Sequence, residues 1–215
     1  MQHNKKCVHK RFNVKEDNAM KATEPVRCKR EVAALANYYK DLKQIRNYVL
    51  IALSIYTALR ICDILRIQWC DVYDFQNERF FNTIRITEKK TKKTKVIALN
   101  QAVIKALKLF IKSAKPERYL IENTRTSKAI CREQAYRIIR AAAEALKLQQ
   151  RVSCHSLRKT FGYHAWKSGV SPAIIMEIYN HSSLAVTRRY LGVTQDDINS
   201  VYLGLSFDVV SKRFI

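Results

Sequence analysis

The chain is poor in residues that break regular structure, with only 4 glycines and 3 prolines among 215 residues. It also lacks a hydrophobic run long enough to cross a membrane, because the longest apolar stretch, residues 49–59, is short and contains Ser54 and Thr57. No apolar leader opens the sequence, so we expect a cytoplasmic protein without a membrane segment. The 47% of hydrophobic residues predicts one folded, helix-rich domain.

Cysteine motifs are absent as well. No CxxC pair occurs among the six cysteines, which are Cys7, Cys28, Cys62, Cys70, Cys131 and Cys154. Scattered cysteines of this kind are expected to be reduced and buried, as in an intracellular protein. The spacing offers no ligand pattern for a Cys/His metal protein.

Acidic residues are scarce: 18 Asp and Glu stand against 40 Lys and Arg, a formal net charge of +22. The positive charge is spread over almost the whole sequence, and such a field attracts polyanions, above all nucleic acid. On composition alone, a ribosome-associated or simply basic soluble protein is the alternative. No acidic cluster has metal-ligand spacing, which argues against a two-metal nuclease.

The chain divides into a short arm and a domain. Residues 1–24 have mixed charge and little apolar periodicity, and we expect them to form a flexible basic arm before a domain covering residues 25–215. Residues 30–60 predict two helices. The second is almost wholly apolar from Tyr48 to Leu59, which predicts a central place in the core, and Arg60 is expected to end it.

Strand-like runs follow at residues 71–75, 79–87 and 95–100, and they predict a three-stranded antiparallel meander. Five lysines lie in or beside its second turn: Lys89, Lys90, Lys92, Lys93 and Lys95. Two amphipathic helices are expected in residues 101–112 and 135–148, with a polar connection between them. The predicted fold class is therefore mainly α with a small three-stranded antiparallel β-sheet (α+β).

The segment HSLRKTFGYHAWKSGVSPAIIMEIYNHSSLAVTRRYLGV, residues 155–193, predicts three helices with their polar groups at starts and junctions. The last of them presents Tyr190. The predicted cap and stop residues are Ser153, Gly169, Ser171 followed by Pro172, and either Ser182 or Ser183.

These helix starts predict an anion site. His155 and Arg158 lie three residues apart on one helix face, at the end where backbone N–H groups are free. Arg60 would add a second guanidinium suited to phosphate oxygens, and Tyr190 is a candidate nucleophile. Taken singly, such residues more often cap helices, pack in a core or lie in solvent. Composition and spacing alone predict a basic helical domain that binds DNA or RNA.

Four stretches in a fixed order carry a more specific signal: TALRICDILRIQWCDV, ITEKKTKKTKVIALN, HSLRKTFGYHA and IYNHSSLAVTRRYLGV. Together they resemble the motifs of the tyrosine recombinases, the phage-integrase family, over residues 25–205. The resemblance is nearest to the short, catalytic-domain-only integrases of Gram-positive bacteria and their mobile elements. It implies the recombinase catalytic-domain fold and site-specific DNA recombination through a 3′-phosphotyrosyl intermediate.

The resemblance also implies roles for single residues. Arg60 and Arg158 would clamp the scissile phosphate, with Asp63 in support. Tyr190 would be the nucleophile. His155 would be its acid/base, His181 a phosphate hydrogen-bond donor, and Lys90 the general acid, with Lys89, Lys92 and Lys93 as competitors for that role. The expected DNA-binding residues are Lys89, Lys92, Lys93, Lys159, Arg188 and Arg189.

The sequence departs from the family pattern at two glycines and in its length. Asn180 replaces the glycine before the second histidine, and it could supply the same left-handed turn. Ala58 replaces another glycine, a change expected to be harmless inside a helix. Only the basic arm precedes the first motif, so an accessory DNA-binding protein or neighbouring protomers are expected to help grip the DNA.

Partners follow from the same resemblance. It implies double-stranded recombination sites, a homotetramer on two synapsed duplexes that is monomeric when free, a nucleoid-associated location, and no cofactor, neither metal nor ATP. Residues 196–215 resemble a tail that docks on a neighbouring protomer, through Ile198, Val201, Tyr202 and Leu205. The alternative is a helix packed on its own domain. The competing functions are a type IB topoisomerase and a non-catalytic DNA-binding protein with this fold.

Overall fold

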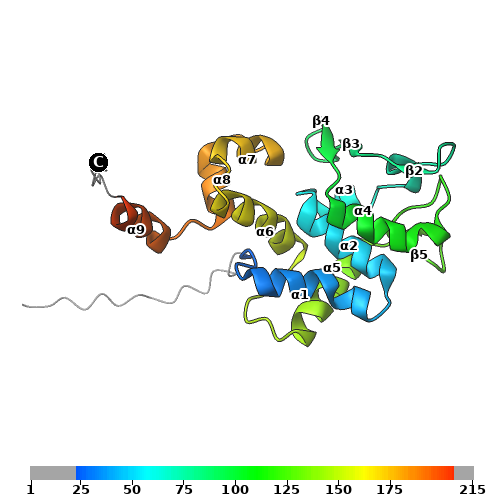
Figure 1. Ribbon diagram of the computed structural model, residues 1–215, viewed down its shortest axis with the longest axis horizontal. Helices are drawn as coiled ribbons and strands as arrows, with labels where there is room; N and C mark the ends of the chain where they lie inside the picture. The colour runs from blue at the N-terminus through cyan, green and yellow to red at the C-terminus, as the bar shows by residue number, and fades with distance from the viewer. Residues whose placement is uncertain (1–22, 206–215) are drawn as a thin grey trace, which may run out of the picture.

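The computed structural model describes residues 23–205, and helices dominate it (Figure 1). The α-helices are α1 (Lys29–Asp41), α2 (Ile45–Tyr56), α3 (Ile61–Ile64), α4 (Gln101–Phe110), α5 (Arg132–Ala145), α6 (Cys154–Lys167), α7 (Pro172–Tyr179), α8 (Leu184–Leu191) and α9 (Gln195–Gly204). Two 3₁₀ turns, Trp69–Asp71 and Ile111–Ser113, complete the helical part. The predicted mainly helical class is confirmed.

The strands form separate antiparallel hairpins rather than one meander. These are β1 (Tyr73–Asp74) with β2 (Arg79–Phe80), β3 (Thr83–Thr87) with β4 (Thr94–Ala98), and β5 (Glu122–Asn123) with β6 (Lys128–Ala129). The predicted strand 79–87 breaks because Phe81 donates its N–H back to Val72, while Asn82 accepts from Leu99 across the next hairpin. The third hairpin lies in the polar connection between residues 112 and 135, where the sequence predicts no strand.

Helix α2 is the centre of the main hydrophobic core. It packs against α1, α4, α5 and α6, and its side chains from Asn47 to Ile55 are all buried. The hydroxyl of Ser54 donates to the Leu50 carbonyl at 2.7 Å, so this polar group is satisfied inside the apolar helix. The expected buried central helix is confirmed.

The end of α2 differs from the expectation. The helix stops at Tyr56, and Ala58 adopts a left-handed conformation with φ 55°. Arg60 is the N-cap of α3, so it begins a helix and does not end one. The prediction that Ala58 sits harmlessly inside a helix was wrong, because the turn needs a left-handed residue and alanine pays about 1–2 kcal/mol for that conformation.

Helices α6, α7 and α8 gather around a second, smaller apolar cluster of Ala58, Ile175, Tyr179 and Leu191. The cap predictions for these helices are confirmed. Ser153, Ser171 and Ser183 each accept a backbone N–H at a helix start, and Gly169, with φ 89°, follows the end of α6.

Helix α9 projects from one end of the molecule beyond α8 (Figure 1). Its apolar side chains are open: Val201 is 67% exposed, Tyr202 78% and Leu203 87%. Within the described residues these side chains do not pack on their own domain. Of the proposed tail, residues 206–215 lie outside the described part, as does most of the basic arm, residues 1–22. No helix between residues 23 and 205 has the length and apolarity needed to cross a membrane.

The described cysteines are unpaired, as expected, but the expectation of burial was wrong for three of them: Cys28, Cys70 and Cys131 are exposed. The sulfur of Cys131 accepts the Gln134 N–H at 3.4 Å, so this residue is placed by its role at the start of α5. Cys62 and Cys154 are partly buried, and Cys7 lies outside the described residues.

Candidate active site

Segments carrying three of the four sequence motifs line a cavity of about 1020 Å³, and the fourth reaches it through the contacts of Tyr190 with Arg158 and His155. Its lining joins the start of α3, the turn between β3 and β4, and the first turns of α5 and α6. The basic residues that line it are Arg60, Lys89, Lys90, Arg132, Arg137 and Arg158. Arg132 and Arg137, together with Tyr136 on the same helix face, were missed by sequence reasoning because α5 carries no family motif. The cavity has the size and charge for a polyanion backbone.

Arg158 is the most constrained cation of the site. It is 2% exposed. Its Nη1 donates to the Ala58 carbonyl, Nη2 donates to the Tyr179 carbonyl at 3.2 Å, and Nε donates to the Tyr190 hydroxyl at 3.2 Å. The guanidinium carbon also lies 4.7 Å from the centre of the Tyr179 ring. Arg158 therefore has one orientation, fixed before any ligand arrives.

Tyr190 is placed by α8 between Arg158 and His155. Its hydroxyl lies 3.3 Å from His155 Nδ1, and its ring meets the rings of His155, His181 and Tyr179, each with centroids 4.8 Å apart. Burial raises the pKa of Tyr190, although the positive charge of Arg158 opposes the rise. The hydroxyl is therefore protonated at neutral pH, so attack on a phosphate needs a base.

The two histidines are neutral at pH 7. Desolvation, followed by repulsion from Lys159 and Arg158, lowers the pKa of His155 to about 4. Desolvation and the positive charges of Arg158 and Arg60 lower the pKa of His181 to about 4 as well. A neutral imidazole can accept the proton of the Tyr190 hydroxyl, and His155 Nδ1 is within reach of it.

His181 and Asp63 are held by different neighbours. His181 Nδ1 lies 3.1 Å from the Thr187 hydroxyl, which fixes the ring through that nitrogen. Asp63 is 1% exposed, and its Oδ1 accepts the backbone N–H of Lys89 at 2.9 Å. Asp63 therefore joins the start of α3 to the lysine-rich turn.

Glu88 is a buried carboxylate that sequence reasoning missed. It has 0% exposure. Its partners are Arg60 Nη1 at 2.8 Å, Lys95 Nζ at 3.1 Å, Thr91 Oγ1 at 2.6 Å and Asn180 Nδ2 at 3.0 Å. Burial alone would raise the pKa of Glu88, but hydrogen bonds from Thr91 and Asn180 and the adjacent Lys95 ammonium lower it to about 2. The available signal was its position as the single acid between Glu78 and Glu117.

The lysines of the β3–β4 turn separate into distinct groups. Lys89 and Lys90 line the cavity, whereas Lys92 and Lys93 are exposed and do not line it. Lys95, on β4, is turned inward, where it pairs with Glu88 and donates to the Ile178 carbonyl. The structure thus brings Lys95 into the site, although it was not among the lysines considered for catalysis.

The remaining expected DNA-binding residues differ in exposure. Arg188 and Arg189 are exposed on α8. Lys159 is 8% exposed, its Nζ donates to the Thr23 carbonyl at 2.6 Å, and it lies 5.5 Å from the centre of the Tyr190 ring. This placement fits a residue that holds the segment before α1 beneath Tyr190 better than one that contacts DNA.

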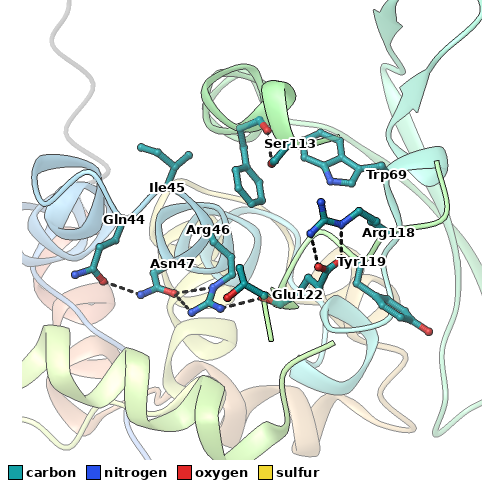
Figure 2. Close-up of a pocket in the computed structure, with 11 residues that line it drawn as sticks. Gln44, Ile45, Arg46, Asn47, Trp69, Ser113, Arg118, Tyr119 and Glu122 are labelled. Atoms are coloured by element: carbon teal, nitrogen blue, oxygen red, sulfur yellow. Dashed lines mark hydrogen bonds and ion pairs between the residues drawn. The ribbon is translucent and has the colours of Figure 1, made fainter. Parts of the chain in front are cut away.

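A second cleft, of about 290 Å³, lies at the start of α2, away from these residues (Figure 2). Its two arginines are occupied by protein partners. Arg46 donates to Asn47 and to the Glu122 carbonyl, and Arg118 donates to the Glu122 carboxylate. We read this cleft as a structural junction. Among residues 23–205, no three His, Cys, Asp or Glu side chains gather as a metal site would require.

A half-buried tyrosine held between an arginine and a neutral histidine, beside a basic cavity, occurs here on the fold of the tyrosine recombinase catalytic domains. The chain matches the crystal structure of XerA recombinase with a TM-score of 0.69, at 21% identity, over 85% of this chain and 66% of that one. It matches XerH recombinase bound to palindromic difH substrate with a TM-score of 0.66, at 18% identity, over 84% of this chain and 52% of that one.

The sequence comparisons define the family. The model described as "Phage integrase family" matches residues 28–196, and the chain belongs to this family. A probable integrase/recombinase of Bacillus subtilis, YoeC, is 37% identical over 183 residues, which are 85% of this chain and 97% of that protein. A tyrosine recombinase of Thermosipho africanus is 24% identical over 85% of this chain but only 59% of its own length. The family resemblance drawn from the four motifs is thus confirmed.

Proposed function

We propose that the protein is a site-specific DNA recombinase that cleaves and rejoins strands through a 3′-phosphotyrosyl intermediate. One observation carries the proposal: the Tyr190 hydroxyl lies 3.2 Å from Arg158 Nε and 3.3 Å from His155 Nδ1, and both of these partners line the cavity rich in cations. The same hydroxyl therefore has a base to take its proton and a guanidinium beside the phosphate it would attack.

The reaction follows from these positions. Arg60 and Arg158 hold the scissile phosphate, and His155 takes the proton as the Tyr190 oxygen attacks phosphorus. The bond from phosphorus to the 5′-oxygen breaks, and a general acid protonates that oxygen. The arginines, with His181 as a further donor, stabilise the charge that develops on the nonbridging oxygens.

Rejoining is the same reaction in reverse. A 5′-hydroxyl of a partner strand gives its proton back to the general acid and attacks the phosphotyrosine. The tyrosine oxygen leaves, and His155 returns the proton to it. Because the phosphotyrosyl bond conserves the phosphodiester energy, the exchange needs neither ATP nor a metal.

For the general acid we retain Lys90, which lines the cavity on the turn after β3. Lys95 is the second candidate because it lies inside the site, but its ammonium already binds Glu88 and the Ile178 carbonyl. A DNA strand with sulfur in place of the scissile 5′-oxygen separates the two, because a thiolate leaves without protonation. Lys90→Ala should cleave this strand at close to the wild-type rate and ordinary DNA slowly. If only Lys95→Ala is rescued by sulfur, the assignment moves to Lys95.

The partners proposed are double-stranded recombination sites and further copies of the chain, which is monomeric when free and tetrameric on two synapsed duplexes. Exposed positive charge for the DNA backbone comes from two arginines of α5 and two of α8: Arg132, Arg137, Arg188 and Arg189. The open apolar side chains of α9, Val201, Tyr202 and Leu203, fit docking on a neighbouring protomer.

Trapping on a suicide substrate tests the function. Wild-type protein and Tyr190→Phe are incubated in EDTA with a nicked duplex that carries a candidate recombination site, and the products are separated by denaturing electrophoresis. A covalent protein–DNA band in the wild type alone is expected. DNA binding by the wild type without any covalent band would favour a non-catalytic DNA-binding protein. Relaxation of supercoiled DNA without strand exchange would favour a type IB topoisomerase.

A further inference from the structure

We propose that Glu88 and Asn180 form a link that positions the active site, joining the β3–β4 hairpin and Arg60 to the turn that carries His181. The proposal rests on the proposed recombinase function. Glu88 would be a positioning residue: it contacts the groups that hold the phosphate, and it does not itself react.

The first observation is the set of segments that meet at one carboxylate. Arg60 approaches from the start of α3, Lys95 from β4, and Asn180 from the end of α7. Arg60 Nη1 pairs with Glu88 Oε2, and Lys95 Nζ pairs with Glu88 Oε1. Neither ion pair has the alignment of a hydrogen bond, so charge dominates both contacts. The hydrogen bonds donated by Thr91 and Asn180 orient the Glu88 carboxylate. Removing the carboxylate would leave two cations facing each other.

The second observation concerns the backbone at Asn180. This residue ends α7 in the left-handed conformation, with φ 51° and ψ 46°. That conformation is the one a glycine would supply, and asparagine tolerates it better than most residues. Glycine, however, has no side chain to donate to Glu88. Asn180 thus gives the same turn and adds a bond across the site, at the residue immediately before His181.

A third contact supports the same link. The Lys95 ammonium bridges the Glu88 carboxylate and the Ile178 carbonyl, so the hairpin is tied to the end of α7 twice. Because Arg60 is bound to Glu88 through Nη1, the rest of its guanidinium is oriented by a group outside the reaction. Arg60, Lys95 and His181 are therefore fixed relative to one another by one buried anion.

Exchanging the carboxylate of Glu88 and the amide of Asn180 tests this link. Asn180→Asp keeps the size and the left-handed tolerance of the residue but places a second carboxylate 3.0 Å from Glu88. Glu88→Gln removes the charge and keeps the shape. In the double variant, the new glutamine amide can donate to the new aspartate, and one negative charge remains in the pair. Glu177→Gln, which removes an exposed carboxylate of α7, is the matched control.

The measurement is the single-turnover rate of covalent-complex formation on the suicide substrate, with DNA concentration varied. Each single variant should be slower at saturating DNA by roughly 10- to 100-fold, the range seen when a supporting contact of a reactive site is lost. The DNA concentration for half-saturation should change less than about threefold, because the other cations that line the cavity remain. The double variant should be at least about tenfold faster than the slower single variant.

Three results would overturn the link: single variants that react at the wild-type rate, a double variant no faster than the slower single one, or an equal loss in the control. Thermal unfolding of all variants gives a second cycle that needs no catalysis. If the wild type forms no covalent complex, the recombinase proposal fails. In that case thermal unfolding alone tests the link: recovery in the double variant of the melting temperature that the single variants lose supports it, and no recovery contradicts it.

Discussion

Helices α2 and α6 pack against each other, yet they bury opposite kinds of side chain. Helix α2 buries an almost continuous apolar run. Helix α6 buries Arg158, Lys159 and Thr160 along with Leu157. The apolar helix α2 is stabilised by the hydrophobic effect, which does not depend on the direction of any single contact. The polar helix is held by bonds that each need one partner in one place, and for that reason it can orient a reactive site.

This difference predicts two kinds of failure. A substitution in α2 should lower stability and leave the chemistry of the folded molecules intact. A substitution of a buried polar group in α6 should lower the reaction rate by more than its effect on folding implies. The predictions below test that separation, beginning with the largest effect.

Arg158→Lys should give the largest loss. Lysine keeps the charge but has a single ammonium, which cannot reach the Ala58 and Tyr179 carbonyls and the Tyr190 hydroxyl together. The rate of covalent-complex formation should fall by about 10²–10³ or more, comparable to the loss of a donor that stabilises a developing oxyanion. Arg140→Lys, on the surface of α5, is the control and should react normally. Equal rates of covalent-complex formation for Arg158→Lys and Arg140→Lys would show that Arg158 takes no part in the reaction.

Leu50→Ala, in α2, should lower stability and leave the reaction rate of the folded molecules unchanged. Leu50 is fully buried in α2, and truncation of such a leucine typically costs about 2–5 kcal/mol of the free energy of unfolding. Urea titration measures this loss, and active-site titration with the suicide substrate corrects the rate for the folded fraction. The corrected rate should match the wild type. A tenfold loss in the corrected rate would mean that α2 and the site are not separable.

Acid should weaken the polar region first. The pKa values of His155 and His181 are lowered to about 4 in the folded protein, from an ordinary value near 6.5. Between those values the unfolded chain binds more protons than the folded one, so the free energy of unfolding should fall as the pH drops from about 6.5 towards 4. Urea titrations across this range measure the slope.

The double variant His155→Gln/His181→Gln identifies the origin of that slope. It should show a flatter pH dependence between pH 6.5 and 4.5, because the stability contributed by Glu88, whose pKa falls from 4.5 to about 2 on folding, is lost mainly below that range. An unchanged slope in the double variant would assign the acid sensitivity to other groups.

The same division marks what the sequence alone could predict. The apolar run of α2 and the serine caps of α6, α7 and α8 act locally, so they were predictable from the residues. The meeting of Tyr190 with Arg158 is a long-range contact, and only the resemblance to a known family indicated it. The burial of Glu88 could not be predicted, because it lies beside a run of lysines in which no local pattern indicates which side chain points inward. The left-handed turn at Ala58 escaped because alanine normally indicates helix.

Ala58 lies where the chain passes from the apolar region to the polar one, and it supports the smallest and sharpest test. Its φ of 55° disfavours alanine by about 1–2 kcal/mol. Ala58→Gly relieves this strain but loses a buried methyl group worth about 0.8 kcal/mol. The net effect should be a gain of about 0.5 kcal/mol in the free energy of unfolding. Ala52→Gly, equally buried within α2, has no strain to relieve and should cost about 1 kcal/mol or more. If the free energy of unfolding rises in Ala58→Gly and falls in Ala52→Gly, the boundary between the apolar and polar regions lies at the end of α2. Equal decreases in both variants would contradict a boundary at that point.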